Sequence, residues 1–331
     1  MKVVVSAKVV TAITGTADVR KLHQLLAYAC DGRHAVLFEE PIASLNAWLQ
    51  QVDEGSRAAY VEALRLSSRA AIRQPENAAT VFIEERASGD WGDPVATLSL
   101  DDALALLNQP LGVLVENSEN DWHFFQGIMR TSEREIVDRA LERSWITALH
   151  GGGSTLPAQL EIRLSKPAEG LRTFVLFDSD RRHPSELEPT WAPVAPQACE
   201  GFNAERIVRP RMPGRFWMLR RRFIESYMPR VQILASGVAE ETANAFFRMP
   251  RDARWHFNMK RGFDADATAE NVGRSQDMYA AVSPEDRQLL KAGLGRKLAE
   301  RYEHATTLDF DWDADARSES ESAIPNLIRL L

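Results

Sequence analysis

The chain has 331 residues, of which 44% are hydrophobic and 26% charged, the composition of an ordinary globular protein with a sizeable core. No apolar run approaches the length of a membrane span, and the first residues lack the hydrophobic stretch of a signal peptide. We therefore expect a cytoplasmic protein without a membrane partner. The net charge of −7 argues against a uniformly basic protein that coats nucleic acid, and two cysteines provide neither a zinc spacing nor a disulfide framework.

The first hundred residues alternate between strand and helix patterns. Short apolar or β-branched runs predict strands at 3–10, 34–38 and 79–85. Apolar residues at three- and four-residue spacing predict helices at 18–29, 57–68 and 99–109. We therefore expect an α/β domain over residues 1–109. It contains no chemical motif, and docking of a partner protein is one role open to it.

A second alternation follows, and its polar residues fall where the predicted strands end. Strands are predicted at 112–116, 144–150 and 173–177, and helices at 121–143 and 156–165. Short loops between alternating strands and helices imply right-handed crossovers and a parallel sheet. Because the carboxyl ends of parallel strands share one edge, Glu116, the glycines 151–153, Asp178 and Asp180 should lie together.

The carboxylates at this edge favour a divalent metal ion. The segment "FVLFDSDRRH" (174–183) has the pattern of a buried strand that ends in Asp178 and Asp180. A turn after the strand is the alternative explanation of this pair alone, since Asp and Ser favour turns. Together with the glutamate and the glycine loop, however, the pair forms a three-part arrangement rich in the oxygen ligands that hard cations prefer. The sequence therefore predicts a metal site here.

These motifs, in this order and spacing, resemble the Toprim domain of topoisomerases, DnaG-type primases and the overcoming-lysogenisation-defect nucleases. The matching positions are Glu116 for the strand-ending glutamate, Gly151, Gly152 and Gly153 for the glycine loop, and Asp178 and Asp180 for the Asp-x-Asp pair. The resemblance covers about residues 110–230. It implies an α/β fold with a Toprim-like parallel sheet flanked by helices over 110–235, and a mainly helical region over 236–331 that completes the structure.

The sequence departs from the Toprim pattern at two positions. Asn117 replaces the glycine that follows the glutamate, although Asn also adopts the left-handed turn conformation. Asn120 stands where nuclease-type members carry a further acid. A one-residue insertion in the turn would bring Asp121 into that place. We therefore expect four metal ligands: Glu116, Asp121, Asp178 and Asp180.

Two downstream segments resemble parts of stand-alone Toprim nucleases that act against phage and plasmids. They are "LRRRFIESYMP" (219–229) and "WHFNMKRGF" (255–263), with Glu225, Tyr227 and Lys260 as the matching positions. The implied catalytic residues are Glu116, Asp178, Asp180, Glu225 and Lys260. Lysine is scarce in this chain, and a compact ammonium can stand beside a phosphate where a planar guanidinium would crowd it. An exposed loop cation is the alternative explanation of Lys260.

The resemblance implies cleavage of phosphodiester bonds in DNA or RNA with Mg²⁺ or Mn²⁺, two ions in the site, in defence against phage or plasmid. Such nucleases commonly act beside a separate ATPase. This chain has no Gly-x-x-x-x-Gly-Lys-Ser/Thr motif, so ATP hydrolysis would require that partner. The sequence leaves the oligomeric state open.

An arginine-rich stretch predicts contacts with the phosphate backbone. Eight arginines and two glutamates lie between Glu205 and Arg230. Arginine pairs bidentately with phosphate, and glycine loops present backbone N–H groups to it. The expected nucleic-acid contacts are Gly151, Gly152, Gly153, Arg215, Arg220, Arg221 and Arg222. A solvated helix face is the alternative explanation of the arginines. The aromatic residues of the same stretch could stack on bases, and packing in the core is the alternative for them.

Two elements are expected in the C-terminal region. The pattern at 283–302 predicts one helix, and the acidic run "DFDWDADARSESE" (309–321) is typical of a solvated stretch near a terminus.

Parts of the sequence are also similar to proteins with three other functions. A non-catalytic Toprim-like module that binds nucleic acid or regulates a partner is consistent with the Asn117 departure. A haloacid-dehalogenase-like phosphatase is a minor alternative, because its aspartates belong on the first strand of the domain. "HGGGS" (150–154) is similar to a lipase oxyanion loop, but the chain has no Gly-x-Ser-x-Gly elbow.

Overall fold

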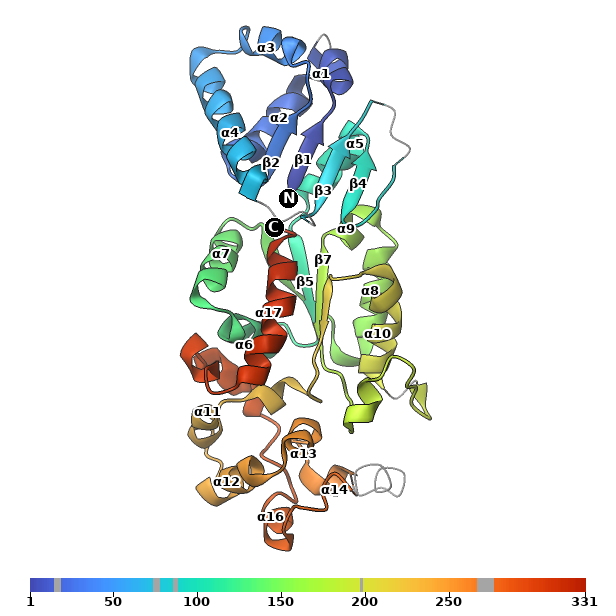
Figure 1. Ribbon diagram of the computed structural model, residues 1–331, viewed down its shortest axis with the longest axis vertical. Coiled ribbons are helices and arrows are strands. Elements are labelled where there is room, and N and C mark those ends of the chain that lie inside the picture. The colour runs from blue at the N-terminus through green and yellow to red at the C-terminus, as the bar shows by residue number, and fades with distance from the viewer. Residues whose placement is uncertain (15–18, 74–77, 86–88, 197–198, 267–276) are drawn as a thin grey trace.

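The computed structural model describes residues 1–14, 19–73, 78–85, 89–196, 199–266 and 277–331. They form two four-stranded parallel sheets flanked by helices (Figure 1). The expected α/β class is therefore confirmed. In Figure 1 the first sheet lies at one end of an elongated molecule, the second in the middle, and a helical segment of the C-terminal region at the other end.

The first sheet has the strand order β2-β1-β3-β4. Its strands are β1 (Lys2–Val5), β2 (Ala35–Phe38), β3 (Thr80–Ile83) and β4 (Val95–Leu98). Its helices are α1 (Ala7–Thr14), α2 (Val19–Cys30), α3 (Ala43–Leu49), α4 (Glu54–Arg73) and α5 (Leu100–Asn108). The predicted strand 3–10 is wrong beyond Val5, because the Ser6 hydroxyl accepts a hydrogen bond from the Val9 N–H (3.4 Å) and α1 begins there.

The second sheet has the order β6-β5-β7-β8, all parallel. Its strands are β5 (Leu111–Val115), β6 (Ile146–His150), β7 (Thr173–Phe177) and β8 (Phe216–Met218). Every residue of β5 and β7 is buried, which explains why both appear in the sequence as unbroken apolar runs. The predicted parallel sheet is confirmed, and its central strands are the two that end in acidic residues.

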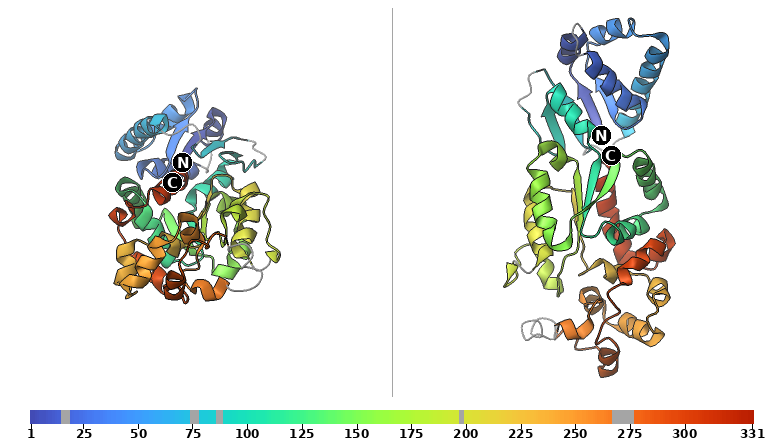
Figure 2. Two further views of the ribbon diagram at one scale, coloured as in Figure 1. Left: turned by 60° about the horizontal axis from the view of Figure 1, so that its bottom comes forward. Right: turned by 180° about the vertical axis from the view of Figure 1, so that it is seen from behind.

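Helices cover both faces of the second sheet, as the view from behind in Figure 2 shows. One face carries α8 (Leu156–Leu164), α9 (Pro167–Leu171) and α10 (Glu200–Arg211). The other carries α6 (Asn120–Ile128), α7 (Thr131–Glu142) and α17 (Ala314–Ile328). The single helix predicted over 121–143 is wrong, because Met129 and Arg130 adopt extended backbone angles and separate α6 from α7.

The C-terminal region extends past the carboxyl end of the second sheet and then returns along it (Figure 1). Its α-helices are α11 (Arg230–Ala235), α12 (Glu240–Arg248), α13 (Arg251–His256), α14 (Gly262–Asp266) and α16 (Pro284–Leu289). Short 3₁₀ helices are η1 (Gly153–Thr155), η2 (Pro184–Leu187), η4 (Ile224–Tyr227), η5 (Leu298–His304) and η6 (Thr307–Phe310). The helix predicted over 283–302 is therefore also wrong. Gly293 (φ 77°) and Gly295 (φ 112°) have left-handed backbone angles between α16 and η5.

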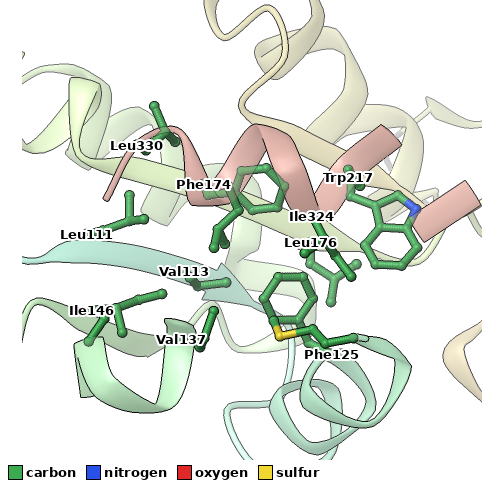
Figure 3. Packing of buried hydrophobic residues seen from close by; sticks show 14 of the residues in the cluster. Leu111, Val113, Phe125, Val137, Ile146, Phe174, Leu176, Trp217, Ile324 and Leu330 are labelled. Carbon is green, nitrogen blue, oxygen red and sulfur yellow. The ribbon is translucent and has the colours of Figure 1, made fainter. Parts of the chain in front are cut away.

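The returning helix α17 completes the core of the second sheet. Figure 3 shows Ile324 of α17 packed near Phe174, Leu176 and Trp217. The same helix contradicts the prediction of a solvated acidic run. Glu319 is buried and accepts hydrogen bonds from the Trp217 indole N–H (2.9 Å) and the Tyr227 hydroxyl (2.8 Å).

None of the helices in the described ranges combines the length and the apolar character needed to cross a membrane.

Candidate functional site

The two central strands of the second sheet bring Glu116 and Asp178 together. Each residue directly follows its strand, β5 or β7, and the strands are hydrogen-bonded neighbours. The Asp178 N–H donates to Glu116 Oε1 at 3.1 Å. Asp178 is only 8% exposed, and its Oδ1 accepts a hydrogen bond from the Ile224 N–H at 2.9 Å. The carboxyl at this strand end is thus built into the protein interior.

A pocket of about 330 Å³ opens beside these two residues. Four carboxylates line it: Glu116, Asp121, Asp178 and Glu225. Three cations line it as well: Lys260, Arg261 and Arg296. The remaining lining residues are Asn117, Asn120, Ile224 and Ala299. Residues far apart in the sequence therefore converge at the carboxyl edge of the second sheet.

Asp121 reaches this pocket from the first turn of α6. Its Oδ2 accepts a hydrogen bond from the Asn117 N–H at 2.8 Å. The Asn117 side-chain oxygen in turn accepts from the N–H groups of Glu119 (2.9 Å) and Asn120 (3.1 Å). Asn117 therefore closes a turn that ends at α6, and this turn places Asp121 in the pocket.

Glu225 and Lys260 form an ion pair inside the pocket. Lys260 Nζ lies 3.2 Å from Glu225 Oε1 and 4.8 Å from the centre of the Phe223 ring. Glu225 is 2% exposed, and its second oxygen, Oε2, is buried without a hydrogen-bond partner in the described part of the chain. An unpartnered buried carboxylate oxygen is rare and calls for a ligand or an ordered water.

Burial and mutual repulsion make the carboxyls of the pocket hard to ionise. Burial, followed by the nearby charges of Asp180 and Asp121, raises the pKa of Glu116 to about 8. Burial is also the main reason that the pKa of Asp121 rises to about 6. Burial and the charge of Glu116 hold the pKa of Asp178 well above its ordinary value. A divalent cation bound here would lower the pKa values of all three carboxyls.

Lys260 lies among the same acids, and their charges favour its charged form. Burial disfavours its charge, but the attraction of Glu225, then of Asp178, outweighs burial and raises the pKa of the Lys260 ammonium. Lys260 is therefore charged at any physiological pH and partly neutralises the acids.

Asp180, the second residue of Asp-x-Asp, lies outside the residues that line the pocket. Its backbone has a left-handed φ of 58°, and its Oδ2 accepts a hydrogen bond from the Gly201 N–H in the first turn of α10 (2.9 Å). Gly201 went unnoticed in the sequence. A methyl group there would lie 2.5 Å from the carbonyl oxygens of Asp178 and Ser179, so only glycine fits against this loop.

Two of the three backbone N–H groups of the glycine loop are already occupied within the protein. The Gly151 N–H donates to the Val115 carbonyl (2.6 Å) and the Gly152 N–H to the Glu116 carbonyl (3.1 Å). These two groups are occupied within the sheet, so the expectation that they bind a phosphate is wrong. The loop instead continues the pairing of β5 and β6, and neither these two glycines nor Gly153 lines the pocket.

Three of the four arginines proposed as nucleic-acid contacts are buried. Arg215 pairs with Asp93 (2.6 Å), Arg221 pairs with Asp313 (2.6 Å), and Arg222 donates to the His256 carbonyl (3.2 Å). Their side chains hold separate segments together and cannot reach a ligand at the surface, so this part of the prediction is wrong. Arg220 alone of the four is exposed.

Arg261 and Arg296 are the cations that the sequence analysis missed. Arg261 directly follows Lys260 in the segment 255–263, which resembles part of the stand-alone Toprim nucleases. This neighbour is the one signal in the sequence that points to Arg261. Arg296 follows a glycine in the segment between α16 and η5, where we expected a continuous helix. Its place in the pocket depends on how the C-terminal region folds back.

The donor set of the pocket suits a hard divalent cation. Nowhere in the described ranges are three His, Cys, Asp or Glu side chains gathered in an arrangement ready to hold an ion. Mg²⁺ commonly binds only one or two protein carboxylates and keeps several waters, so it does not need three. The unpartnered Glu225 Oε2 and the strained acids Glu116 and Asp178 are the groups that would gain from such an ion.

Comparisons with models of protein families, with curated proteins and with solved structures found no match to this chain. The assignment of a function therefore depends on the geometry of the pocket and on the sequence motifs at its strand ends.

Proposed function

We propose that the protein is a Toprim-like, metal-dependent nuclease that cleaves phosphodiester bonds in DNA or RNA. The main support is the convergence of Glu116, Asp121, Asp178 and Glu225 on one pocket that also contains Lys260. Four carboxylates in one pocket, three of them buried, are destabilising unless a cation offsets them, and such arrangements are typical of functional sites.

In this proposal Glu116, Asp178 and Glu225 would share the divalent ions between them, and Asp121 would support them from α6. Bound Mg²⁺ or Mn²⁺ would supply the positive charge that lowers the pKa of a water nucleophile and stabilises charge on the phosphate. Asp180 holds the loop after β7 in place through its hydrogen bond to Gly201. Lys260 neutralises charge that develops on the phosphate group.

The cationic side of the pocket suits a nucleic-acid backbone. Lys260, Arg261 and Arg296 line the pocket together with the acids, and both arginines are exposed. Arginine binds phosphate oxygens bidentately and without regard to base sequence. These residues replace the buried arginines of the 215–222 stretch as the proposed backbone contacts.

A cleavage assay tests the proposal. Supercoiled plasmid, single-stranded DNA and tRNA are each incubated with the wild-type protein and Mg²⁺, Mn²⁺ or EDTA. We expect cleavage of at least one substrate with metal and none with EDTA. Asp178→Asn and Glu116→Gln should abolish cleavage, whereas Glu119→Gln, a nearby exposed carboxylate outside the pocket, should cut like the wild type.

Binding without cleavage in every arm would instead support a non-catalytic module. The resemblance to defence nucleases further suggests a cytoplasmic role against phage or plasmid beside a separate ATPase. The same assay repeated with the products of neighbouring genes tests whether activity requires that partner.

A further inference from the structure

A second pocket lies near the opposite end of the second sheet, close to the chain termini marked in Figure 1. Its volume is about 460 Å³, within the range of small-molecule sites. The loop between α2 and β2, helix α4, helix α7 and the residue before β6 surround it. Its polar and aromatic lining includes Arg33, His34, Ser67, Arg139, Arg143 and Trp145.

The pocket is cationic. Arg33, Arg139 and Arg143 line it against one acidic side chain, Asp31. Arg33 donates to the carbonyls of Asn108 (3.0 Å) and Gln109 (2.9 Å), and Arg143 donates to the Asp31 carbonyl (2.7 Å). Within the described residues none of the three arginines forms an ion pair with a carboxylate side chain. The charge of Asp31 acts on Arg33, but the side chains of the pocket keep an excess of positive charge.

A buried arginine behind the pocket adds to this positive field. Arg172 is 1% exposed and contacts the carbonyls of Gln109 and Leu330 and the Met1 sulfur. Burial, and then the charge of Arg33, lowers the pKa of Arg172 to about 9. This arginine, too, lacks an anionic partner in the part of the chain that the structure describes.

Two residues that line the pocket carry buried polar atoms without partners. Arg33 Nε and His34 Nδ1 are buried and have no hydrogen-bond partner among the described residues. His34 is 3% exposed, and its Nε2 lies 3.1 Å from the Leu107 carbonyl, which fixes the proton on Nε2. The bare Nδ1 therefore requires a donor. Unsatisfied buried groups of this kind usually mark a ligand or ordered water.

The rest of the wall is apolar. Leu66, Ala70, Ile136 and Ala140 line it, and Leu66 and Ile136 are 50% and 36% exposed. Trp145 adds an aromatic ring, with the Arg143 guanidinium 4.8 Å from its centre. A ligand that fits this pocket has an anionic group, a hydrogen-bond donor and a flat apolar part.

We propose that this pocket binds a mononucleotide. The phosphate would lie against Arg139 and Arg143. Because His34 Nδ1 is closed off from solvent, a sugar hydroxyl or an exocyclic amine would donate to it only where the pocket wall opens on binding. The base would pack on the apolar wall formed by α4 and α7. Because this pocket is separate from the carboxylate pocket, it is a second site and not part of the substrate cleft.

Calorimetric titration of the full-length protein with AMP, GMP, CMP and UMP tests the proposal. EDTA is present throughout, so that no metal holds nucleotide in the carboxylate pocket. At least one nucleotide should bind in the presence of excess inorganic phosphate, and the corresponding nucleoside should bind more weakly. The double substitution Arg139→Gln/Arg143→Gln removes two exposed charges and should weaken binding by about tenfold or more.

Two matched variants serve as controls. Arg134→Gln removes a half-buried charge of the same helix, which pairs with Asp138 (3.6 Å) outside the pocket, and Asp178→Asn disables the carboxylate pocket; both should bind nucleotide like the wild type. The proposal is wrong if no nucleotide binds at millimolar concentration, if phosphate alone competes fully, or if the double variant binds as tightly as Arg134→Gln. Its failure leaves the cleavage assay unaffected, so the two proposals are tested separately.

Discussion

At the scale of single residues, Glu116 shows how its surroundings set the protonation of one carboxyl. In the unfolded chain it loses its proton near the ordinary pKa of 4.5, whereas in the folded chain it keeps the proton until about pH 8. Between these values the folded state binds more protons than the unfolded state. Glu116 therefore lowers the free energy of unfolding progressively as the pH rises through this window.

The substitution Glu116→Gln should remove that dependence. In metal-free buffer, we expect the variant to gain stability relative to the wild type between pH 5 and pH 8, on the order of 1–3 kcal/mol, because each unit of pKa shift corresponds to about 1.4 kcal/mol. Denaturant unfolding of both proteins at several pH values measures the difference in their free energies of unfolding. The contributions of other groups cancel in this difference. Parallel stability curves for the two proteins would show that Glu116 is not strained.

Lys260 has a structural and a proposed catalytic role, and its stability effect and its kinetic effect are measured separately. Lys260→Met leaves Glu225 as an unpaired buried charge, so it should destabilise the fold by about 1–3 kcal/mol as well as lower the turnover rate. Adding Glu225→Gln removes that unpaired charge and should restore most of the stability. Lys260→Arg should keep the charge and still cut slowly.

Thermal unfolding and single-turnover kinetics on the same samples measure both effects. A Lys260→Met variant that is destabilised but cuts at the wild-type rate would show that Lys260 acts only through the fold.

The residues at strand ends could be predicted, and the buried arginines could not. Glu116 and Asp178 follow long apolar runs, and any parallel sheet brings such positions to one edge. Arg221, in contrast, pairs with Asp313, which is 92 positions away in the sequence. A cluster of arginines looks the same in the sequence whether it faces a nucleic acid or an internal acid, and the partner only becomes visible in the folded chain.

At the scale of elements, the glycines at the strand ends hold the edge of the sheet together. A methyl group at Gly151 would lie 2.5 Å from Leu156 Cδ1 and 2.8 Å from the Val115 carbonyl oxygen. Gly151→Ala and Gly201→Ala should therefore each destabilise the protein by about 1–3 kcal/mol and displace the residues that line the carboxylate pocket.

Gly153→Ala is the matched control. Nothing lies within 4 Å of a methyl group there, and the cost should be limited to about 1 kcal/mol for its left-handed φ of 52°. Thermal unfolding of the three variants ranks them. Equal losses at Gly151 and Gly153 would contradict the close approach at Gly151.

The Arg221–Asp313 pair joins the segment after β8 to the start of α17. Arg221→Ala leaves Asp313 buried and unpaired, so it should cost about 3–5 kcal/mol in stability. Its nearest control, Arg220→Ala, changes an exposed side chain and should cost less than about 0.5 kcal/mol. Denaturant unfolding compares the stabilities of the two variants. If Arg221→Ala lowered the affinity for nucleic acid without a loss of stability, Arg221 would be a binding residue after all.

At the scale of the whole molecule, the sequence predicted the two α/β alternations but not how the C-terminal region closes on them. Helix α17 contributes Ile324 to the core of the second sheet, and Arg296 reaches the carboxylate pocket from the segment before η5. Ile324 lies more than a hundred residues from Phe174 and Trp217, and Arg296 more than a hundred from Glu116 and Asp178. Hydrophobic periodicity gives no pairing information over such separations. The broken helices have a local cause, the glycine and extended-backbone positions between them.

The strands of the two sheets have the same order. In each sheet the second strand along the chain lies at one edge, and the first strand lies beside it. Their carboxyl edges nevertheless differ. In the first sheet Glu39 and Glu84 follow the strands and are exposed to solvent, whereas Asp178 in the second sheet is buried under the C-terminal region. The returning chain is therefore what converts a row of strand-end acids into a pocket.

The central claim is that the carboxylates of this pocket bind divalent cations, and a Mn²⁺ titration followed by electron paramagnetic resonance tests it most directly. The signal of free Mn²⁺ should fall as the wild-type protein is added, with one or two sites per chain, and Mg²⁺ should displace the bound ions. Asp178→Asn and Glu116→Gln should lose this binding, while Glu119→Gln keeps it. A wild-type protein that leaves the Mn²⁺ signal unchanged, or an Asp178→Asn variant that binds as tightly as the wild type, would contradict the account.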